Sequence, residues 1–135
     1  MQRDPQKKGK IKNKILVVED EFGLQETFRE VFQEEGYDVR VAADGENGYK
    51  IYQMFQPDLI LTDVVMPKIS GIELSKKIRI LNPKIKVIYV SGYFGLKNIK
   101  RELEEEIQKY SYPFLSKPFQ ISLMLKLVKE YLNKQ

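Results

Sequence analysis

Four runs of mostly apolar residues along the chain each end at a polar or charged residue. They are Ile15–Val18 before Glu19 and Asp20, Asp58–Thr62 before Asp63, Val87–Val90 before Ser91, and Tyr112–Ser116 before Lys117. The first three runs show little alternation, which is typical of strands covered by helices on both faces. Because parallel strands share one carboxyl edge, the polar residues that follow them are expected to converge there.

Between these runs, apolar residues recur at helical spacing. One helix is predicted after Asp20 and ends at Gly36, which suits a helix C-terminus. Further helices are predicted between Gly45 and Pro57, from about Gly71 to Leu81, around the charged residues 102–109, and over residues 121–132. Tyr37–Val41 alternates as a short strand. Five strands and five helices then alternate as (βα)5, which predicts a doubly wound parallel five-stranded sheet.

The basic character of the chain is concentrated at its N-terminus. Six lysines and arginines against Asp4 alone give residues 1–14 a net charge of +5, whereas the whole chain carries +4. We therefore expect a basic flexible tail over residues 1–13 and one folded domain over residues 14–135. The tail has no aromatic residue, so direct nucleic-acid or membrane contact is the less favoured interpretation.

Composition excludes several kinds of chemistry. The chain contains neither cysteine nor histidine, which rules out disulfides, thiolate or imidazole metal sites, and Ser-His catalysis. No apolar run is long enough to span a bilayer, and the first residues do not form a signal peptide. A cytoplasmic protein is expected.

Three carboxylates stand at two of the predicted strand ends. Glu19 and Asp20 follow the first strand, and Asp63 follows the third. Converging carboxylates repel one another, and a hard cation such as Mg²⁺ relieves that repulsion, with Mn²⁺ as a substitute. Asp20 alone could equally serve as the N-cap of the following helix.

Asp63 suggests a more specific hypothesis, that of a carboxylate nucleophile that accepts a phosphoryl group. Lys117 precedes Pro118, which favours an extended backbone and would let the amine reach over the sheet edge toward phosphate oxygens. Ser91 could bind a phosphoryl oxygen through its hydroxyl. Each residue is weak evidence alone, because aspartates and serines often begin loops, and their joint placement carries the argument.

Together, these residues resemble the motifs of a known family. The chain from about Lys14 to Leu132 resembles the receiver domain of two-component response regulators, which has a flavodoxin-like fold. The resemblance rests on Ile15–Glu21, Asp58–Pro67, Ser70-Gly71, Val90–Gly92 and Phe114–Phe119.

The resemblance implies a role for each of these positions. Asp63 would be the phosphoacceptor, Glu19 and Asp20 the acidic pair, and the backbone carbonyl of Val65 a further Mg²⁺ ligand. It also implies that Ser91 and Phe114 form a switch, that Lys117 contacts the phosphoryl group, and that the Lys117-Pro118 peptide bond is cis. Phe114 carries no hydroxyl, so its part in a switch would be a packing rotation.

The resemblance also implies partners. A sensor histidine kinase or a histidine phosphotransfer protein would donate the phosphoryl group, and the domain would catalyse only its own phosphorylation and dephosphorylation. The surface formed by the charged helix near Glu104, the fifth strand and the last helix would contact a second copy or a downstream protein. No effector module is recognisable, so the sequence does not identify the kinase, the output, or whether the domain stands alone or belongs to a hybrid kinase.

The resemblance further places Val65 and Tyr93 beside the path of the water that would hydrolyse an aspartyl phosphate. Neither side chain is suited to hold that water, because valine forms no hydrogen bond and tyrosine is bulky. A long-lived phosphoryl state is therefore expected.

Three other functions compete with this interpretation. A haloacid-dehalogenase-like phosphatase needs an Asp-x-Asp pattern after the first strand, where this chain has Glu19-Asp20-Glu21. A flavodoxin-like cofactor binder needs a phosphate-cradling loop there, and these acids would repel phosphate. A receiver that is not phosphorylated and serves only for interaction is the more serious rival, against which the full set of acidic and lysine positions argues.

Overall fold

The computed structural model describes residues 12–92 and 97–134, and in them five strands form one parallel sheet. The strands are β1 (Lys14–Val18), β2 (Asp38–Ala42), β3 (Leu59–Asp63), β4 (Lys86–Ser91) and β5 (Phe114–Ser116). Their order across the sheet is β2-β1-β3-β4-β5, and every neighbouring pair is parallel. The order reverses between β1 and β3, which is where open α/β sheets place their sites.

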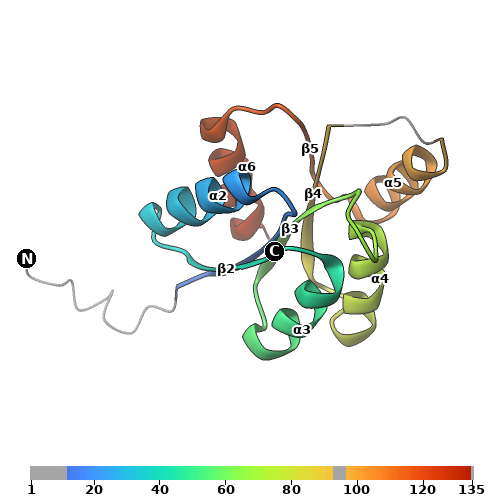
Figure 1. The fold of residues 1–135 in the computed structure, drawn as a ribbon, viewed down its shortest axis with the longest axis horizontal. Coiled ribbons are helices and arrows are strands. Elements are labelled where there is room, and N and C mark those ends of the chain that lie inside the picture. Colours follow the sequence, from blue (N-terminus) through green and yellow to red (C-terminus); the bar gives the residue numbers. More distant parts are fainter. Residues whose placement is uncertain (1–11, 93–96, 135) are drawn as a thin grey trace, which may run out of the picture.

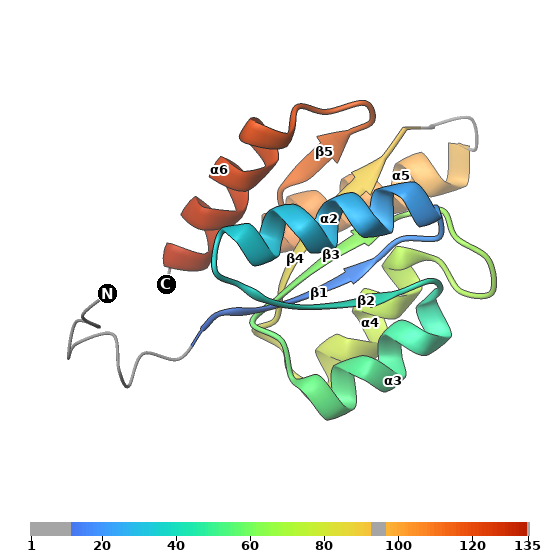
Figure 2. The ribbon, with the colours of Figure 1, turned by 60° about the vertical axis from the view of Figure 1, so that its left-hand side comes forward.

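Helices cover both faces of the sheet (Figures 1 and 2). One face carries α2 (Phe22–Glu34) and α6 (Ile121–Asn133), and the other carries α3 (Gly45–Phe55), α4 (Gly71–Leu81) and α5 (Lys97–Tyr110). The predicted doubly wound (βα)5 fold is thereby confirmed. None of the helices in the described part of the chain is long and apolar enough to cross a membrane.

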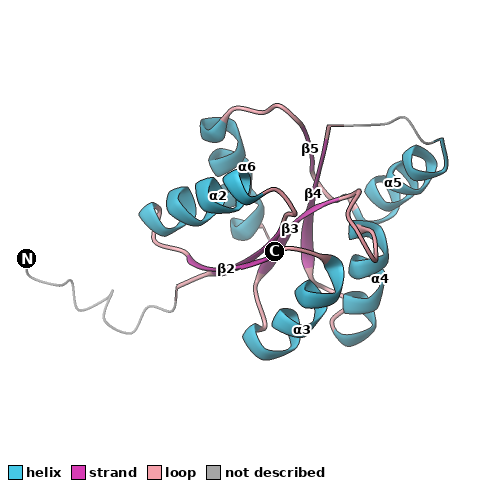
Figure 3. Cartoon of the chain, viewed as in Figure 1, coloured by secondary structure: helices cyan, strands magenta, loops and turns pink. Residues whose placement is uncertain are grey.

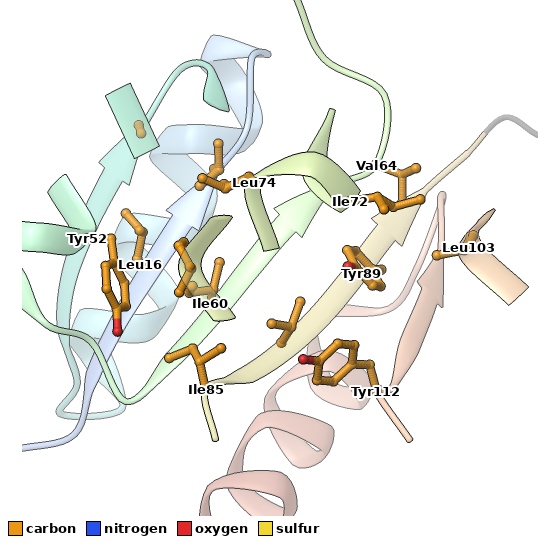
Figure 4. Close-up of a cluster of buried hydrophobic side chains, with 14 residues drawn as sticks. Leu16, Tyr52, Ile60, Val64, Ile72, Leu74, Ile85, Tyr89, Leu103 and Tyr112 are labelled. Atoms are coloured by element: carbon orange, nitrogen blue, oxygen red, sulfur yellow. The ribbon is translucent and has the colours of Figure 1, made fainter. Parts of the chain in front are cut away.

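The two layers of helices enclose two separate cores, and each strand contributes to both. In β1, Leu16 packs under α3 and α4, whereas its neighbour Ile15 packs under α2 and α6. Figure 4 shows the first of these cores, in which Leu16 and Ile60 come from neighbouring strands and pair in register. Successive side chains of a strand point to opposite faces of the sheet. Because helices cover both faces, the side chains on both must be apolar, which explains the continuous apolar runs.

Local signals in the sequence set the helix ends. Gly36, just after α2, has a φ of 90°, a conformation that strongly favours glycine. The Asp44 side chain accepts a hydrogen bond of 2.8 Å from the Asn47 backbone N–H and so caps α3. Ser70 caps α4 in the same way through the Glu73 N–H. Because these caps fix where α3 and α4 start, they also fix the loops at the carboxyl edge of the sheet.

The fifth strand is shorter than predicted. The sequence predicts a strand over residues 112–116, but β5 begins only at Phe114. Figure 3 colours the chain by secondary structure. Pro113 has no N–H to donate to the sheet, although its carbonyl still accepts a hydrogen bond from Tyr89. Tyr112 is therefore a buried residue outside the strand.

Candidate functional site

The register of the sheet aligns the polar strand ends. Val18 pairs with Thr62, so the next residues in their strands, Glu19 and Asp63, emerge side by side. Ser91 pairs with Ser116 at the ends of β4 and β5, which places Lys117 at the same edge. These ends meet beneath the loops at the carboxyl edge of the sheet (Figure 2).

Three carboxylates form a cluster at this edge. One oxygen from each of Glu19, Asp20 and Asp63 lies within 4.8 Å of the others. Glu19 and Asp63 are only 1% and 5% exposed, whereas Asp20 is exposed. The N-cap of α2 is Glu21, which makes no side-chain cap hydrogen bond, so capping does not explain Asp20. The three acids therefore converge at one edge of the sheet, as predicted from the sequence.

Several hydrogen bonds hold the loop that carries the acidic pair. The Glu19 backbone N–H donates to the Ala42 carbonyl at 3.0 Å, and the Glu19 carbonyl accepts a bond of 2.7 Å from the Gln25 side chain. One Glu19 carboxylate oxygen also accepts from the Glu21 N–H at 3.0 Å. Gln25 was not predicted as part of the site, since a glutamine in the first turns of a helix carries no signal of such a contact.

Lys117 lies across the cluster from β5. Its Nζ is 3.0 Å from Glu19 Oε1 and 3.0 Å from Asp63 Oδ1. Its backbone N–H donates to the Ser91 carbonyl at 3.0 Å, which ties it to the end of β4. A Cβ at Gly92 would lie 2.9 Å from the Lys117 Cβ, so glycine permits this approach. The Lys117-Pro118 bond is cis, and that prediction is confirmed.

Burial and neighbouring charge act strongly on Asp63. Desolvation, followed by the contact with Glu19, raises the pKa of Asp63 to about 8, although Lys117 opposes the rise. For Lys117, burial lowers the pKa, but the two carboxylates outweigh burial and the net shift is upward. Without a further cation, the single ammonium does not fully compensate the two buried acids.

The site suits a hard divalent cation. Asp63 Oδ1 is buried, and the Lys117 ammonium 3.0 Å away also contacts Glu19 at the same distance. Three convergent carboxylates beside a single ammonium match the oxygen ligands that Mg²⁺ prefers. Glu19, Asp20 and Asp63 are thus a fitting ligand set.

The other predicted site residues that the structure describes lie at the end of β4, at the start of β5 and in the segment after β3. Ser91 ends β4 and is 6% exposed, and Phe114 begins β5 and is half-buried. Val65 follows Asp63 by two residues and is 45% exposed. Tyr93 lies outside the described residues.

One close backbone contact at the acceptor was not predicted. The Gly71 N–H donates to the Val64 carbonyl at 2.8 Å, and a Cβ at Gly71 would lie 1.9 Å from the Asp63 carbonyl oxygen. The same carbonyl accepts a hydrogen bond of 2.9 Å from the Thr62 hydroxyl. The N-terminus of α4 therefore packs directly on the backbone of the proposed acceptor.

Residues 15–129 match the family model described as the response regulator receiver domain. The chain belongs to this family. This receiver domain is similar to sporulation initiation phosphotransferase F of Bacillus subtilis (strain 168), with 34% identity over 119 residues, 88% of this chain and 93% of the relative. It is also 35% identical over 123 residues to the sensor kinase CckA of Brucella abortus (strain 2308), which covers 90% of this chain but only 13% of CckA.

A solved structure supports the same assignment of the receiver domain. The CheY-like response regulator receiver domain protein from Methanospirillum hungatei JF-1 superimposes with a TM-score of 0.82 at 27% identity. The match covers 91% of this chain and 95% of that one. Relatives of this receiver domain therefore include both chains of its own size and segments of much larger kinases.

Proposed function

We propose that this receiver domain is cytoplasmic and accepts a phosphoryl group on Asp63 from the phosphohistidine of a sensor histidine kinase or histidine phosphotransfer protein. The observation that carries the proposal is the buried Asp63 carboxylate, which lies at the carboxyl edge of the sheet 3.0 Å from the Lys117 ammonium and next to two further acids. The name of the similar sporulation phosphotransferase and the kinase context of CckA also support a role in phosphoryl transfer.

In the proposed reaction, an Asp63 carboxylate oxygen attacks the phosphorus of the donor. The phosphorus–nitrogen bond breaks, its electron pair stays on the donor imidazole, and an acyl phosphate forms on Asp63. The Lys117 ammonium, which already contacts Asp63, would pair with a phosphoryl oxygen. Water later attacks the phosphorus, the bond to the Asp63 oxygen breaks, and inorganic phosphate leaves, which restores the carboxylate. The domain thus catalyses only its own phosphorylation and dephosphorylation.

Glu19, Asp20, Asp63 and the Val65 carbonyl would hold Mg²⁺, with Mn²⁺ as a substitute. The bound ion supplies charge neutralisation for the attack of one anion on another. Asp20 is exposed and can adjust without disturbing the core, whereas Glu19 is fixed by the Glu21 and Lys117 contacts. Glu19 would thus be a rigid ligand and Asp20 an adaptable one.

The proposed output surface comprises α5, β5 and α6. Ser91 would move toward the phosphoryl group, Phe114 would rotate into the space released, and a second copy or a downstream protein would read the altered surface. Residues 14–135 are the proposed receiver unit, preceded by a basic tail over residues 1–13.

Metal dependence provides a direct test of this function. Incubation with acetyl phosphate and Mg²⁺, followed by intact mass measurement, should show the addition of one phosphoryl group, and chelation of the metal should abolish it. Asp20→Ala should weaken Mg²⁺ binding and phosphorylation, whereas Glu104→Ala, an exposed acid on α5, should not. Equal behaviour of the two variants would contradict the proposed metal site.

A further inference from the structure

Glu106 on α5 is a buried acid far in sequence from the carboxylate site. It is 5% exposed, and beyond Glu19 and Asp63 it is the only buried acidic residue among those that the structure describes. The two acids that directly precede it in α5, Glu104 and Glu105, are exposed. A charged helix usually keeps its carboxylates in water, so the burial of this one requires partners.

Glu106 has two strong partners on other elements. Arg79 of α4 donates from Nη1 to Glu106 Oε1 at 2.8 Å and from Nη2 to Oε2 at 2.9 Å, a bidentate pair. The Tyr89 hydroxyl of β4 donates to Glu106 Oε1 at 2.7 Å. We call Arg79, Tyr89 and Glu106 the clamp, because together they join α4, β4 and α5.

Aromatic rings complete the surroundings of the clamp. The Arg79 guanidinium lies 4.0 Å from the centre of the Tyr110 ring and also donates to the Tyr112 hydroxyl at 3.2 Å. The rings of Tyr89 and Tyr112 meet edge to face at 5.8 Å. Figure 4 shows these two tyrosines together with Leu103 of α5 at one end of the core. The arginine is thus confined on several sides and cannot easily change its position.

The clamp adjoins the predicted switch residues. Tyr89 lies two residues before Ser91 in β4, so both side chains emerge on the same face of the sheet. It also pairs in register with Phe114 of the neighbouring strand. One residue of the clamp therefore neighbours both Ser91 and Phe114.

The clamp also connects to the acceptor through α4. Gly71 at the start of this helix packs on the Asp63 carbonyl, and Arg79 lies about two turns further along the same helix. A buried ion pair contributes little net stability, but it fixes one arrangement, because displacing either partner leaves an uncompensated charge. This property suits a device that holds a helix in a defined position.

We propose that the clamp has two roles. It holds α5 in its resting position, and it transmits movement of Ser91 and Phe114 to this helix. Its holding role concerns the unphosphorylated protein and is independent of the reaction. Its transmitting role rests on the proposed phosphorylation of Asp63.

The holding role is tested by hydrogen exchange of α5 amides in the unphosphorylated protein. Tyr89→Phe keeps the ring and removes one hydrogen bond to a charged group, and it should accelerate exchange in α5 about tenfold. Glu106→Gln should have a larger effect, whereas Glu104→Gln, an exposed site on the same helix, should leave exchange unchanged. If α5 amides of Tyr89→Phe exchanged at the wild-type rate, the proposal would be overturned, even if Glu106→Gln failed to fold.

The transmitting role is tested by the same measurement after treatment with acetyl phosphate and Mg²⁺. Wild type and Tyr89→Phe should gain the same phosphoryl mass, but the change in α5 exchange on phosphorylation should be lost in the variant. An undiminished change would refute transmission through the clamp. Absence of phosphoryl mass in the wild type would refute the proposed function instead, and the resting-state comparison would still decide the holding role.

Discussion

At the scale of single residues, the burial of Asp63 affects the stability of the folded protein. The buried carboxylate has a pKa of about 8 against an ordinary value of 3.8. A raised carboxyl pKa means that the folded state binds the proton more tightly than the unfolded chain does, so stability falls as pH rises from about 4 to about 8. The site is therefore built at the expense of stability in the absence of metal.

Asp63→Asn should accordingly stabilise the metal-free protein at neutral and higher pH. We expect a gain in the free energy of unfolding that exceeds about 1 kcal/mol at pH 8, since one pKa unit corresponds to about 1.4 kcal/mol. Urea unfolding of both proteins with a chelator, at several pH values, measures the difference. The gain should vanish near pH 4, and a gain independent of pH would contradict the electrostatic explanation.

Val65 provides a second prediction at this scale. Its side chain is exposed, follows Asp63 by two residues in the sequence, and has no group that could hydrogen-bond an attacking water. Val65→Asn or Val65→Glu should shorten the lifetime of the aspartyl phosphate, by up to about 10²-fold if the new group assists proton transfer. The decay of the phosphoryl mass after removal of the donor gives this lifetime, with Val65→Ala as the control. Equal lifetimes in all four proteins would place control of hydrolysis elsewhere.

At the scale of elements, the contact between α4 and β3 leaves no room for a side chain. A Cβ at Gly71 would meet the Asp63 carbonyl oxygen, which is backbone and cannot move without displacing the acceptor. Gly71→Ala should therefore destabilise the protein by about 1–3 kcal/mol and slow phosphorylation. Gly23→Ala is the matched control, because only the end of the Glu21 side chain lies near that position.

Denaturant unfolding and the rate of phosphoryl mass gain measure the two effects of Gly71→Ala. A Gly71→Ala protein with the stability and rate of Gly23→Ala would show that α4 can move away from β3 freely. That result would also remove the link between the acceptor and Arg79.

The elements themselves were largely predictable from sequence. Continuous apolar runs identified β1, β3 and β4, and the resulting parallel edge predicted that Glu19, Asp20 and Asp63 converge. Contacts between distant residues were not predictable, since nothing local indicates that Arg79 meets Glu106. One signal was available, because Glu106 shares a helical stripe with Ile99 and Leu103, which suggests burial.

At the scale of the whole molecule, the sheet separates two tasks. The carboxyl ends of β1 and β3 carry the acids, whereas α5, β5 and α6 lie toward the β5 edge of the sheet (Figure 2). Ser91 ends β4 and so stands between the two regions. Ser91 therefore offers a route from the acids to this surface across β4, beside the route through α4 and Arg79.

Ser91→Ala tests this coupling across the molecule. The variant should still take up one phosphoryl group, because Asp63 and Lys117 are unchanged, but the conformational response of residues 97–134 should be largely lost. Amide chemical shifts with and without acetyl phosphate report that response residue by residue. Shift changes equal to those of wild type would contradict a role for the Ser91 hydroxyl.

The central claim is that Asp63 is the phosphoacceptor, and intact mass measurement of Asp63→Asn tests it most directly. The matched control is Asp58→Asn, which replaces an exposed aspartate directly before the start of the same strand. With acetyl phosphate and Mg²⁺, wild type and Asp58→Asn should each gain one phosphoryl group, and a correctly folded Asp63→Asn should gain none. Full phosphorylation of Asp63→Asn would contradict the assignment.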